Sequence, residues 1–282
     1  MTKKNVFGVL KTSAAISLAL IVIAPAIYVL LGATTGTSHI QIMLDEYKSG
    51  ILHYAPARFL FENKSLSGFA ELFASRRHAV SLLHTIVYAF LAMFAQLLVS
   101  LPIGFFFAKW KFKGREIIVN FFIFAMILPF QVTLVPNYIM FRALGILDTY
   151  WCLVLPGMFS PFGVYLFYQF NRQVPDDLIY AARIDGASTT RLLVSVVAPN
   201  IASGIAAFGV VSFIIEWSKV APALSFIRDM DKQPLSIVLR ETMQLTPEKI
   251  FAPSVVYMLP PLLAYIVFAS KIHDGFRIVP KN

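Results

Sequence analysis

Residue types that commonly carry out chemistry are few in this chain, and they are scattered. There is one cysteine, Cys152, which excludes an intrachain disulfide and a cysteine-based metal cluster. The motifs G-x-x-x-x-G-K-[ST], H-E-x-x-H and G-x-S-x-G are absent. No two of the five histidines have a helical spacing that suits a metal. They are His39, His53, His78, His84 and His273. We therefore expect no metal site, no bound cofactor, no catalytic site and no ATP hydrolysis by this chain.

One polar segment, residues 172–199, has the residue types of a docking element. Asp176 suits the first turn of a helix, because an acid there meets the positive end of the helix dipole. Gly186 can adopt the left-handed turn that ends such a helix, and Ser188 can cap a second one. Pro199 is expected to stop the helical pattern before the next apolar run. The segment is thus predicted to be a pair of short helices.

The first of these helices carries small residues, Ala181 and Ala182, and Ala187 follows beyond the turn. Small side chains let the backbone of a partner approach closely, and Arg183 and Asp185 could supply charges at the rim. An amphipathic linker that lies on the membrane surface is the alternative interpretation. From the residues alone, the two interpretations stand about even.

The elements that must position this segment are membrane helices. Of the 282 residues, 58% are hydrophobic and 14% are charged, whereas soluble domains are about a quarter charged. A soluble core of this length could not bury so much apolar surface. A membrane helix needs about 20 apolar residues, and six stretches qualify: 13–34, 80–108, 117–141, 151–171, 201–221 and 251–270. We predict an all-α polytopic membrane protein with six transmembrane helices.

The charge distribution predicts the orientation in the cell membrane. Residues 109–115, Lys-Trp-Lys-Phe-Lys-Gly-Arg, form a short basic connection that the positive-inside rule places in the cytoplasm. The net charge of +9 then needs no nucleic-acid partner, because anionic lipid headgroups suffice. The predicted organisation is an inner tail with the first helix (1–34), an outer loop (35–79), a five-helix core (80–271) that contains the cytoplasmic loop 172–199, and a cytoplasmic tail (272–282).

Few polar groups lie within the predicted spans. Glu216 is the one carboxylate well inside them, whereas proton- or sodium-driven carriers usually place several ionisable groups near the midplane. Gln131 lies near the expected mid-depth of its span, beside Pro129, and ranks first as a solute contact. The other candidates are Gln96, Asn137, Tyr138, Tyr165, Glu216 and Trp217. Each is more often an interhelical contact or an interfacial anchor.

The polar loop resembles the EAA loop of the permeases of ABC importers, a family whose members pair with cytoplasmic ATPases. The family pattern is E-A-A, three residues, G, nine residues, I-x-L-P, and Ala181, Ala182, Gly186 and Pro199 match it at the right spacing. The run Arg-Ile-Asp-Gly-Ala-Ser that starts at Arg183 is similar to the carbohydrate, maltose-type branch.

Three positions depart from the pattern. Tyr180 stands where the family has glutamate, so stacking or a hydrogen bond could replace an ionic contact with the ATPase. Val196 and Ala198 stand where isoleucine and leucine are usual. The tail also lacks the glycine-rich ending that is common in maltose-type subunits.

The resemblance implies a type I ABC-importer permease. Two permease subunits, usually related but distinct, would form a pathway for a carbohydrate. An ATPase dimer holding ATP and magnesium would grip the inner loops, and an extracytoplasmic binding protein would deliver the cargo. The residues that the resemblance implies for ATPase coupling are Asp177, Tyr180, Ala181, Ala182, Arg183, Asp185, Gly186, Ala187, Ser188 and Pro199. A permease for a non-sugar solute, a self-contained carrier or channel, and a membrane-embedded enzyme remain as alternatives.

Overall fold

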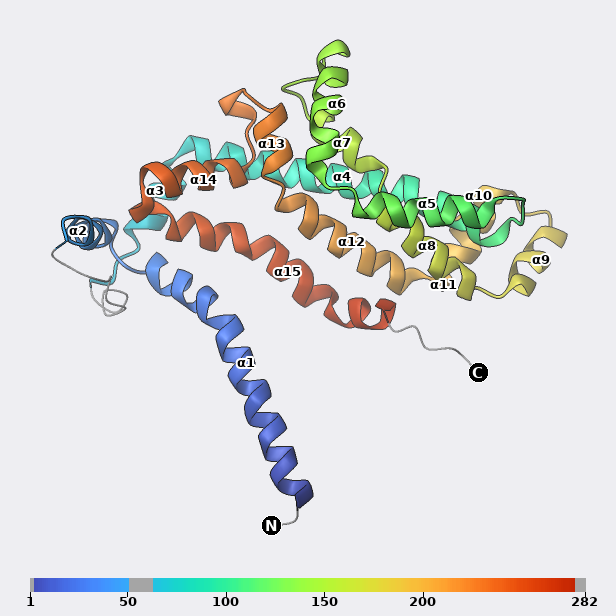
Figure 1. The fold of residues 1–282 in the computed structure, drawn as a ribbon, viewed down its shortest axis with the longest axis horizontal. Coiled ribbons are helices and arrows are strands. Elements are labelled where there is room, and N and C mark those ends of the chain that lie inside the picture. Colours follow the sequence, from blue (N-terminus) through green and yellow to red (C-terminus); the bar gives the residue numbers. More distant parts are fainter. Residues whose placement is uncertain (1–2, 51–62, 277–282) are drawn as a thin grey trace. The chain divides into compact units, whose positions relative to one another are not determined.

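The secondary structure of the chain is helical almost throughout (Figure 1). The computed structural model describes residues 3–50 and 63–276, with side chains described over 11–50 and 63–273, so His53 and residues 277–282 of the predicted tail lie outside it. Within those ranges, the extended structure is a single isolated antiparallel bridge between Thr35 and Lys64. The all-α prediction is confirmed.

Three helices each contain one stretch that is long and apolar enough to cross a membrane. They are α1 (Lys3–Ala33), α4 (Arg76–Lys109) and α15 (Phe251–Phe276). Three further candidates are bent pairs: α5 (Arg115–Ile127) with α6 (Phe130–Ala143), α7 (Trp151–Met158) with α8 (Pro161–Gln173), and Thr189–Asn200 with α12 (Ala202–Trp217). The bends are 95°, 41° and 86° respectively. If each bent pair counts as one span, the number of candidate membrane spans, judged by length and composition, equals the six predicted.

Two of the three breaks lie directly before a proline. Leu128 and Ser160 have extended ψ angles of 119° and 106°, and they precede Pro129 and Pro161. The proline ring disfavours helical backbone in the preceding residue, so both helices end there. The third break is at Ile201 (φ −114°, ψ 22°), which no proline follows. The stretch 117–141, predicted as one span, therefore consists of two helices that meet at 95°.

The chain divides into two compact units, Met1–Ala79 with Val238–Leu259 and Val80–Ile237 with Pro260–Asn282. In the first unit, α1 packs its last turns near the start of α15, where the rings of Tyr28 and Phe251 lie 5.6 Å apart. Two shorter helices, α2 (Thr37–Lys48) and α3 (Ser67–Ala74), lie within the predicted outer loop.

An ionic contact ties α3 to the short helix η4 (Pro247–Lys249) in this unit. The Lys249 ammonium lies 2.9 Å from the Glu71 carboxylate, which also accepts a hydrogen bond from Thr37. The contact with Lys249 lowers the pKa of Glu71 below its usual range.

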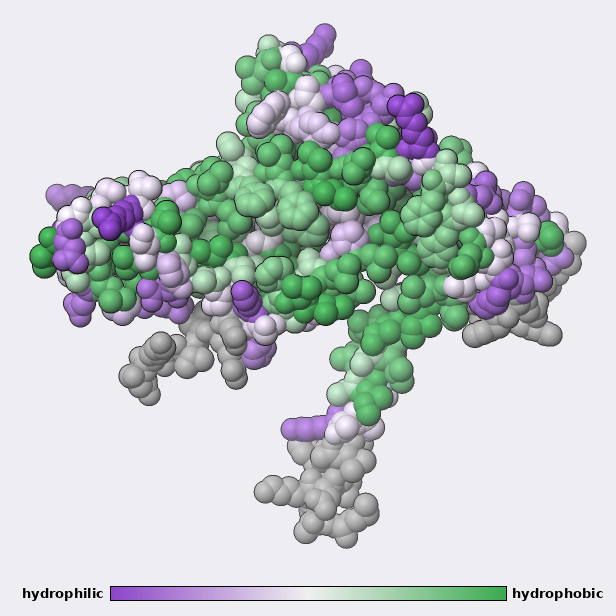
Figure 2. Space-filling view, turned by 180° about the vertical axis from the view of Figure 1, so that it is seen from behind, coloured by the Kyte–Doolittle hydropathy of each residue, from purple (hydrophilic) through white to green (hydrophobic). Residues whose placement is uncertain are grey.

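Over residues 16–30, α1 carries exposed apolar side chains such as Ile21 and Val22, and Figure 2 shows this part of the helix as a mostly apolar column.

Contacts among α4, α8 and α12 hold the second unit together. The α8 helix contacts both α5 and α12. Phe167 of α8 meets Phe208 of α12 edge to face, with ring centroids 5.1 Å apart. Gly104 of α4 faces the backbone of α8, where a Cβ atom would lie 2.6 Å from the Cβ of Phe167 and 2.7 Å from the nitrogen of Tyr168. The close approach of α4 and α8 therefore requires glycine at this position.

The segment after α12 folds back onto the same unit. The α12 helix ends at Trp217, before the predicted end at residue 221, and the chain continues through α13 (Ala221–Phe226), η3 (Met230–Lys232) and α14 (Leu235–Leu245). The hydroxyl of Tyr88 donates to the carbonyl of Lys232, and the amide of Leu235 donates to the hydroxyl of Thr85. These bonds fasten the segment to α4.

The close approach at Gly104 predicts a strong effect of one added methyl group. We expect Gly104→Ala to cost about 1–3 kcal/mol through overpacking, seen as a midpoint several degrees lower when the purified protein is heated and followed by size-exclusion chromatography. Gly209→Ala is the matched control, because its Cβ would make ordinary contacts of 3.9 Å or longer in another membrane helix. Equal midpoints for the two variants would contradict this account of the α4–α8 contact.

Candidate functional site

The polar loop begins with the helix α9 (Asp176–Ile184), which lies beyond the ends of α8 and α11 (Figure 1). Asp176 and Asp177 occupy its first turn and Arg183 its last, as the helix dipole favours. At its end, the amide of Gly186 donates to the carbonyl of Arg183, and the amide of Ala187 donates to that of Ala182. This pair of bonds is the Schellman ending, and Gly186 has the left-handed φ of 77° that it requires.

A second helical segment follows directly. The Ser188 hydroxyl accepts a hydrogen bond from the amide of Arg191 and so caps α10 (Thr189–Arg191). A π-helical stretch, η2 (Leu192–Val197), and α11 (Ala198–Asn200) continue the same segment. The predicted pair of short helices is confirmed.

The predicted role of Pro199 as the residue that stops the pattern is wrong. Pro199 lies inside the helical segment that η2 and α11 form, and the helical backbone continues past it to Asn200. The break falls one residue later, at Ile201.

The inner face of the loop rests on an apolar core. Ile179 of α9 and Leu192 and Val197 of η2 are buried with Phe105 and Phe167 of the membrane helices. Ala182 and Ala187 also pack against this cluster. Two of the three small residues expected to face a partner therefore face the core of the chain itself, because their size lets α9 approach η2. Ala181, in contrast, is exposed.

Contacts at both ends of α9 attach it to the end of α4. At the first end, the Lys109 ammonium lies 2.7 Å from the Asp176 carboxylate and donates to the carbonyl of Val174 at 2.5 Å. At the second end, the Arg183 guanidinium lies over the ring of Trp110, 5.0 Å from its centroid. The Lys109 side chain is only 5% exposed, so this ammonium depends on these two acceptors.

The bond from Lys109 holds the pKa of the Asp176 carboxyl below its usual range. Because the pKa is lowered in the folded protein, the contact stabilises the fold above the ordinary pKa of an aspartate. That stabilisation disappears as the pH falls through the lowered pKa. The attachment of α9 is therefore unaffected by pH changes near neutrality.

The outer face of α9 is uncovered in the chain. Asp177, Tyr180, Ala181 and Ile184 recur at the i, i+3, i+4, i+7 spacing of one helix face, and all four are exposed. Ile184 is 87% exposed and Tyr180 is 58% exposed. Asp185 and Ser188, beyond this face, are exposed as well. Sequence reasoning missed Ile184, although its position four residues after Tyr180 was a sufficient signal.

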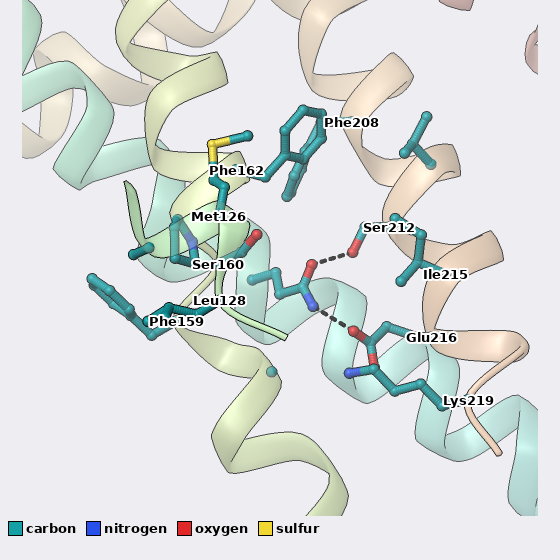
Figure 3. Close-up of a pocket in the computed structure, with 15 residues that line it drawn as sticks. Met126, Leu128, Phe159, Ser160, Phe162, Phe208, Ser212, Ile215, Glu216 and Lys219 are labelled. Atoms are coloured by element: carbon teal, nitrogen blue, oxygen red, sulfur yellow. Dashed lines mark hydrogen bonds and ion pairs between the residues drawn. The ribbon is translucent and has the colours of Figure 1, made fainter. Parts of the chain in front are cut away.

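A second polar feature lies among the membrane helices, around a cavity of about 480 Å³. The side-chain amide of Gln96 in α4 donates to the Glu216 carboxylate of α12 at 2.6 Å, and the Ser212 hydroxyl donates to the Gln96 carbonyl. The other oxygen of Glu216 lies 2.6 Å from the ammonium of Lys219. Figure 3 shows this chain of contacts along one wall of the cavity.

The remaining walls come from two of the helix breaks. Leu128 lies at the α5–α6 break, and Phe159 and Ser160 form the α7–α8 break. Phe162 and Phe208 add aromatic surface (Figure 3). Polar side chains thus meet an aromatic cavity where the membrane helices are interrupted, as is common at transport sites.

The predicted solute contacts separate into two groups. Glu216 and Gln96 line the cavity. Gln131, ranked first from the sequence, is exposed in the first turn of α6 and is not among the residues that line the cavity, since the break at Leu128 redirects the chain. Sequence reasoning missed Lys219. Within the helix predicted to extend to residue 221, its position three residues after Glu216 was a signal, whereas in the structure it lies just beyond the end of α12 at Trp217.

Three other predicted solute contacts are surrounded, at least in part, by other residues of the chain. Tyr138 accepts a hydrogen bond from Arg228 at 3.0 Å, and the neighbouring Asn137 is half-buried. Trp217 is buried beside Phe213, with ring centroids 5.5 Å apart. Their predicted contact with a solute remains a prediction. No three described His, Cys, Asp or Glu side chains gather in a way that could hold a metal ion.

A multi-pass bundle of interrupted helices, with a polar cavity at the breaks and a helix pair anchored at one end, has the architecture of a membrane-transport component. The chain belongs to the family of binding-protein-dependent transport system inner membrane components, which its residues 100–272 match. The resemblance seen in the sequence is confirmed at the level of the family.

Two curated relatives illustrate the family. Protein LplC of Bacillus subtilis (strain 168) is 33% identical over 166 residues, which are 59% of this chain and 54% of LplC. The sn-glycerol-3-phosphate transport system permease protein UgpE of Escherichia coli (strain K12) is 34% identical over 150 residues, 53% of each chain. The matches thus span about half the length of these relatives.

Solved structures share the fold. A chain from a bacterial ABC transporter involved in the import of the acidic polysaccharide alginate superposes with a TM-score of 0.78 at 20% identity, covering 96% of this chain and 98% of that one. A chain of the MetNI methionine ABC transporter, in an inward-facing conformation, has a TM-score of 0.55 at 16% identity, covering 76% of this chain and 100% of that one.

The attachment of α9 predicts the effect of removing the buried ammonium. We expect Lys109→Gln to raise the hydrogen-exchange rate of the amides of residues 176–184, because the carboxylate and carbonyl at the start of α9 lose their shared donor. Lys111→Gln is the matched control, since it removes the same charge two residues away. Equal exchange in the two variants would show that Lys109 does not hold α9.

Proposed function

We propose that this chain is a permease subunit of an ATP-driven importer, forming half of a translocation pathway for a carbohydrate. It would couple to a cytoplasmic ATPase through the loop 172–199. In this proposal the chain is not an enzyme, since ATP and magnesium are held and ATP is hydrolysed by the partner ATPase dimer. A second permease subunit, related but distinct in sequence, would complete the pathway.

The observation that carries this proposal is the uncovered face of α9 combined with its firm attachment. Asp177, Tyr180 and Ile184 offer one acid and two large apolar groups to a soluble partner. A force applied to that face would pass to α4 through Lys109 and Trp110. It would also pass to the other membrane helices through the apolar core beneath α9. Closure of two ATPase subunits could thus rock the bundle between its inward- and outward-facing states.

The orientation follows from the basic connection at residues 109–115. Its position in the cytoplasm, by the positive-inside rule, puts the adjoining α9 on the side where ATP is available. Both termini then lie in the cytoplasm, and a binding protein would deliver cargo to the opposite face. The family description, which names binding-protein-dependent transport, supports that partner.

The carbohydrate cargo has support from the names of similar proteins. One structural neighbour belongs to an importer of the polysaccharide alginate, and another alginate transporter chain (TM-score 0.61, 13% identity) comes from a complex with a periplasmic protein bound to an alginate pentasaccharide. A permease for a non-sugar solute is the second candidate, because the methionine transporter shares the fold. A self-contained carrier is disfavoured by the single ion pair, Glu216 with Lys219, that lines the membrane cavity.

The coupling role predicts a severe effect at Gly186. Valine there would have to adopt a φ of 77°, which a β-branched residue resists, so the end of α9 and the following turn should rearrange. We expect Gly186→Val to abolish uptake and cargo-stimulated ATPase activity of the reconstituted importer while the chain still inserts into the membrane.

Gly145→Val provides the matched control for this experiment. Gly145 also has a left-handed φ, 66°, and no neighbouring atoms within 4 Å of a Cβ, but it lies after α6, outside the loop. It should retain ATPase stimulation. Normal uptake by a correctly inserted Gly186→Val protein, or equal loss in both variants, would contradict the coupling role.

A further inference from the structure

The charged groups that line the membrane cavity cancel each other. Of the described residues around it, two are charged, Glu216 and Lys219, and they form an ion pair at 2.6 Å. The Glu216 side chain is almost fully buried, whereas that of Lys219 is about a quarter exposed. Charges placed in a membrane protein interior are costly unless paired, so the pair is the stable arrangement.

The neighbouring polar groups are already directed at this pair. Gln96 donates to one Glu216 oxygen while Lys219 contacts the other, and Ser212 donates to the Gln96 carbonyl. The carboxylate therefore has a partner on each oxygen. Gly157 keeps the space above the pair open, since a Cβ there would lie 3.1 Å from the Lys219 ammonium and 3.4 Å from the Glu216 carboxylate.

Hydrogen-bonding capacity towards the cavity nevertheless remains. An ammonium has three donors, and Lys219 directs one of them to Glu216. The Ser160 hydroxyl oxygen accepts from the amide of Gly163, which leaves its own O–H as a donor. These donors face a cavity whose other walls are largely apolar, including Phe159, Phe162 and Phe208 (Figure 3).

We propose that this cavity is a hydrated, charge-balanced section of the cargo pathway that takes an uncharged, hydroxyl-rich ligand and disfavours an acidic one. Hydroxyl groups can bond to Lys219 and Ser160 without breaking the ion pair, and the apolar faces of a sugar ring fit against phenylalanine. An anionic ligand would have to displace Glu216 from Lys219 or enter as an uncompensated charge, and both are unfavourable in a site of low dielectric.

This inference rests on the proposed importer function and deepens it by naming the charge class of the cargo. It also sets this chain apart from the transporter of an acidic polysaccharide that shares its fold. In this chain, the positive charge that could attract an acid is already taken by Glu216.

The test measures which reagents reach the cavity from water. In a Cys152→Ala background, Ile215→Cys places a thiol in the cavity wall of the full chain, expressed with its partners in native membrane vesicles. The probes are the neutral hydroxyethyl, the cationic trimethylammonioethyl and the anionic sulfonatoethyl methanethiosulfonates. Leu98→Cys is the control, because Leu98 is an exposed apolar residue of a membrane helix that does not line the cavity.

We expect Ile215→Cys to react with all three probes and Leu98→Cys to remain unreactive. Each labelling rate of Ile215→Cys is divided by the rate at which the same probe labels a free thiol. The resulting values for the cationic and the anionic probe should agree within about threefold, because the charges of Glu216 and Lys219 cancel. Adding Lys219→Gln should favour the cationic probe by about tenfold, and adding Glu216→Gln should favour the anionic probe by a similar factor. The neutral rate serves as the folding control and should stay unchanged in both variants.

A second arm identifies the ligand class. At equal concentrations, a panel of neutral sugars should include at least one that slows labelling by the neutral probe, and the matching uronates should not. Protection by uronates alone, or by neither class, would overturn the proposal. So would an unreactive Ile215→Cys or a strong charge preference before Lys219 and Glu216 are changed. Because labelling needs neither ATP nor ATPase stimulation, its failure is distinguishable from failure of the coupling role.

Discussion

The attachment of α9 to the end of α4 is the contact on which the proposed function of this chain depends. Lys109 is nearly fully buried and is satisfied by Asp176 and the carbonyl of Val174, while Arg183 stacks over Trp110. Isolated ion pairs at a surface contribute little, but a buried ammonium that loses its acceptors is expensive. The two contacts, one at each end of α9, fix the orientation of the helix as well as its position. Without them, α9 would be a flexible link between membrane helices and a poor transmitter of force.

Proline-directed breaks have a comparable effect within the membrane helices. Leu128 and Ser160 are extended because each precedes a proline, and the resulting interruptions border the cavity that Glu216 and Gln96 reach from other helices. A continuous helix in either place would carry its side chains past this region. The interruption thus creates room for polar groups in an otherwise apolar bundle, where the ion pair with Lys219 keeps the Glu216 carboxylate stable.

The sequence predicts most local features of the loop correctly, Pro199 excepted, and its tertiary contacts poorly. The start of α9 at Asp176, the left-handed Gly186 and the Ser188 cap depend on neighbouring residues, so residue type and spacing are enough to predict them. The bond from Lys109 to Asp176 joins positions 67 apart, and that from Gln96 to Glu216 joins positions 120 apart. No periodicity in a single sequence connects such positions.

Direction is the other property that the sequence does not determine. Ala182 and Ala187 are small enough for a partner to approach, but small residues serve equally well where α9 meets its own core. Gln131 is central in its apolar stretch, which implied a position near mid-depth in the membrane. The bend after Leu128 divides that stretch into two helices, so a central position no longer indicates that depth. In each case the residue type was informative, and the face that it occupies was set by contacts far away in the chain.

Photo-crosslinking at Ile184 tests the central claim most directly. A photoreactive amino acid in place of Ile184, activated in intact cells, should capture a nucleotide-binding ATPase that mass spectrometry identifies. The same group in place of Leu245, which is also strongly exposed but lies at the end of α14, should not. Capture of lipid alone at Ile184, or of the same proteins from both positions, would contradict the account of α9 as the surface that meets the ATPase.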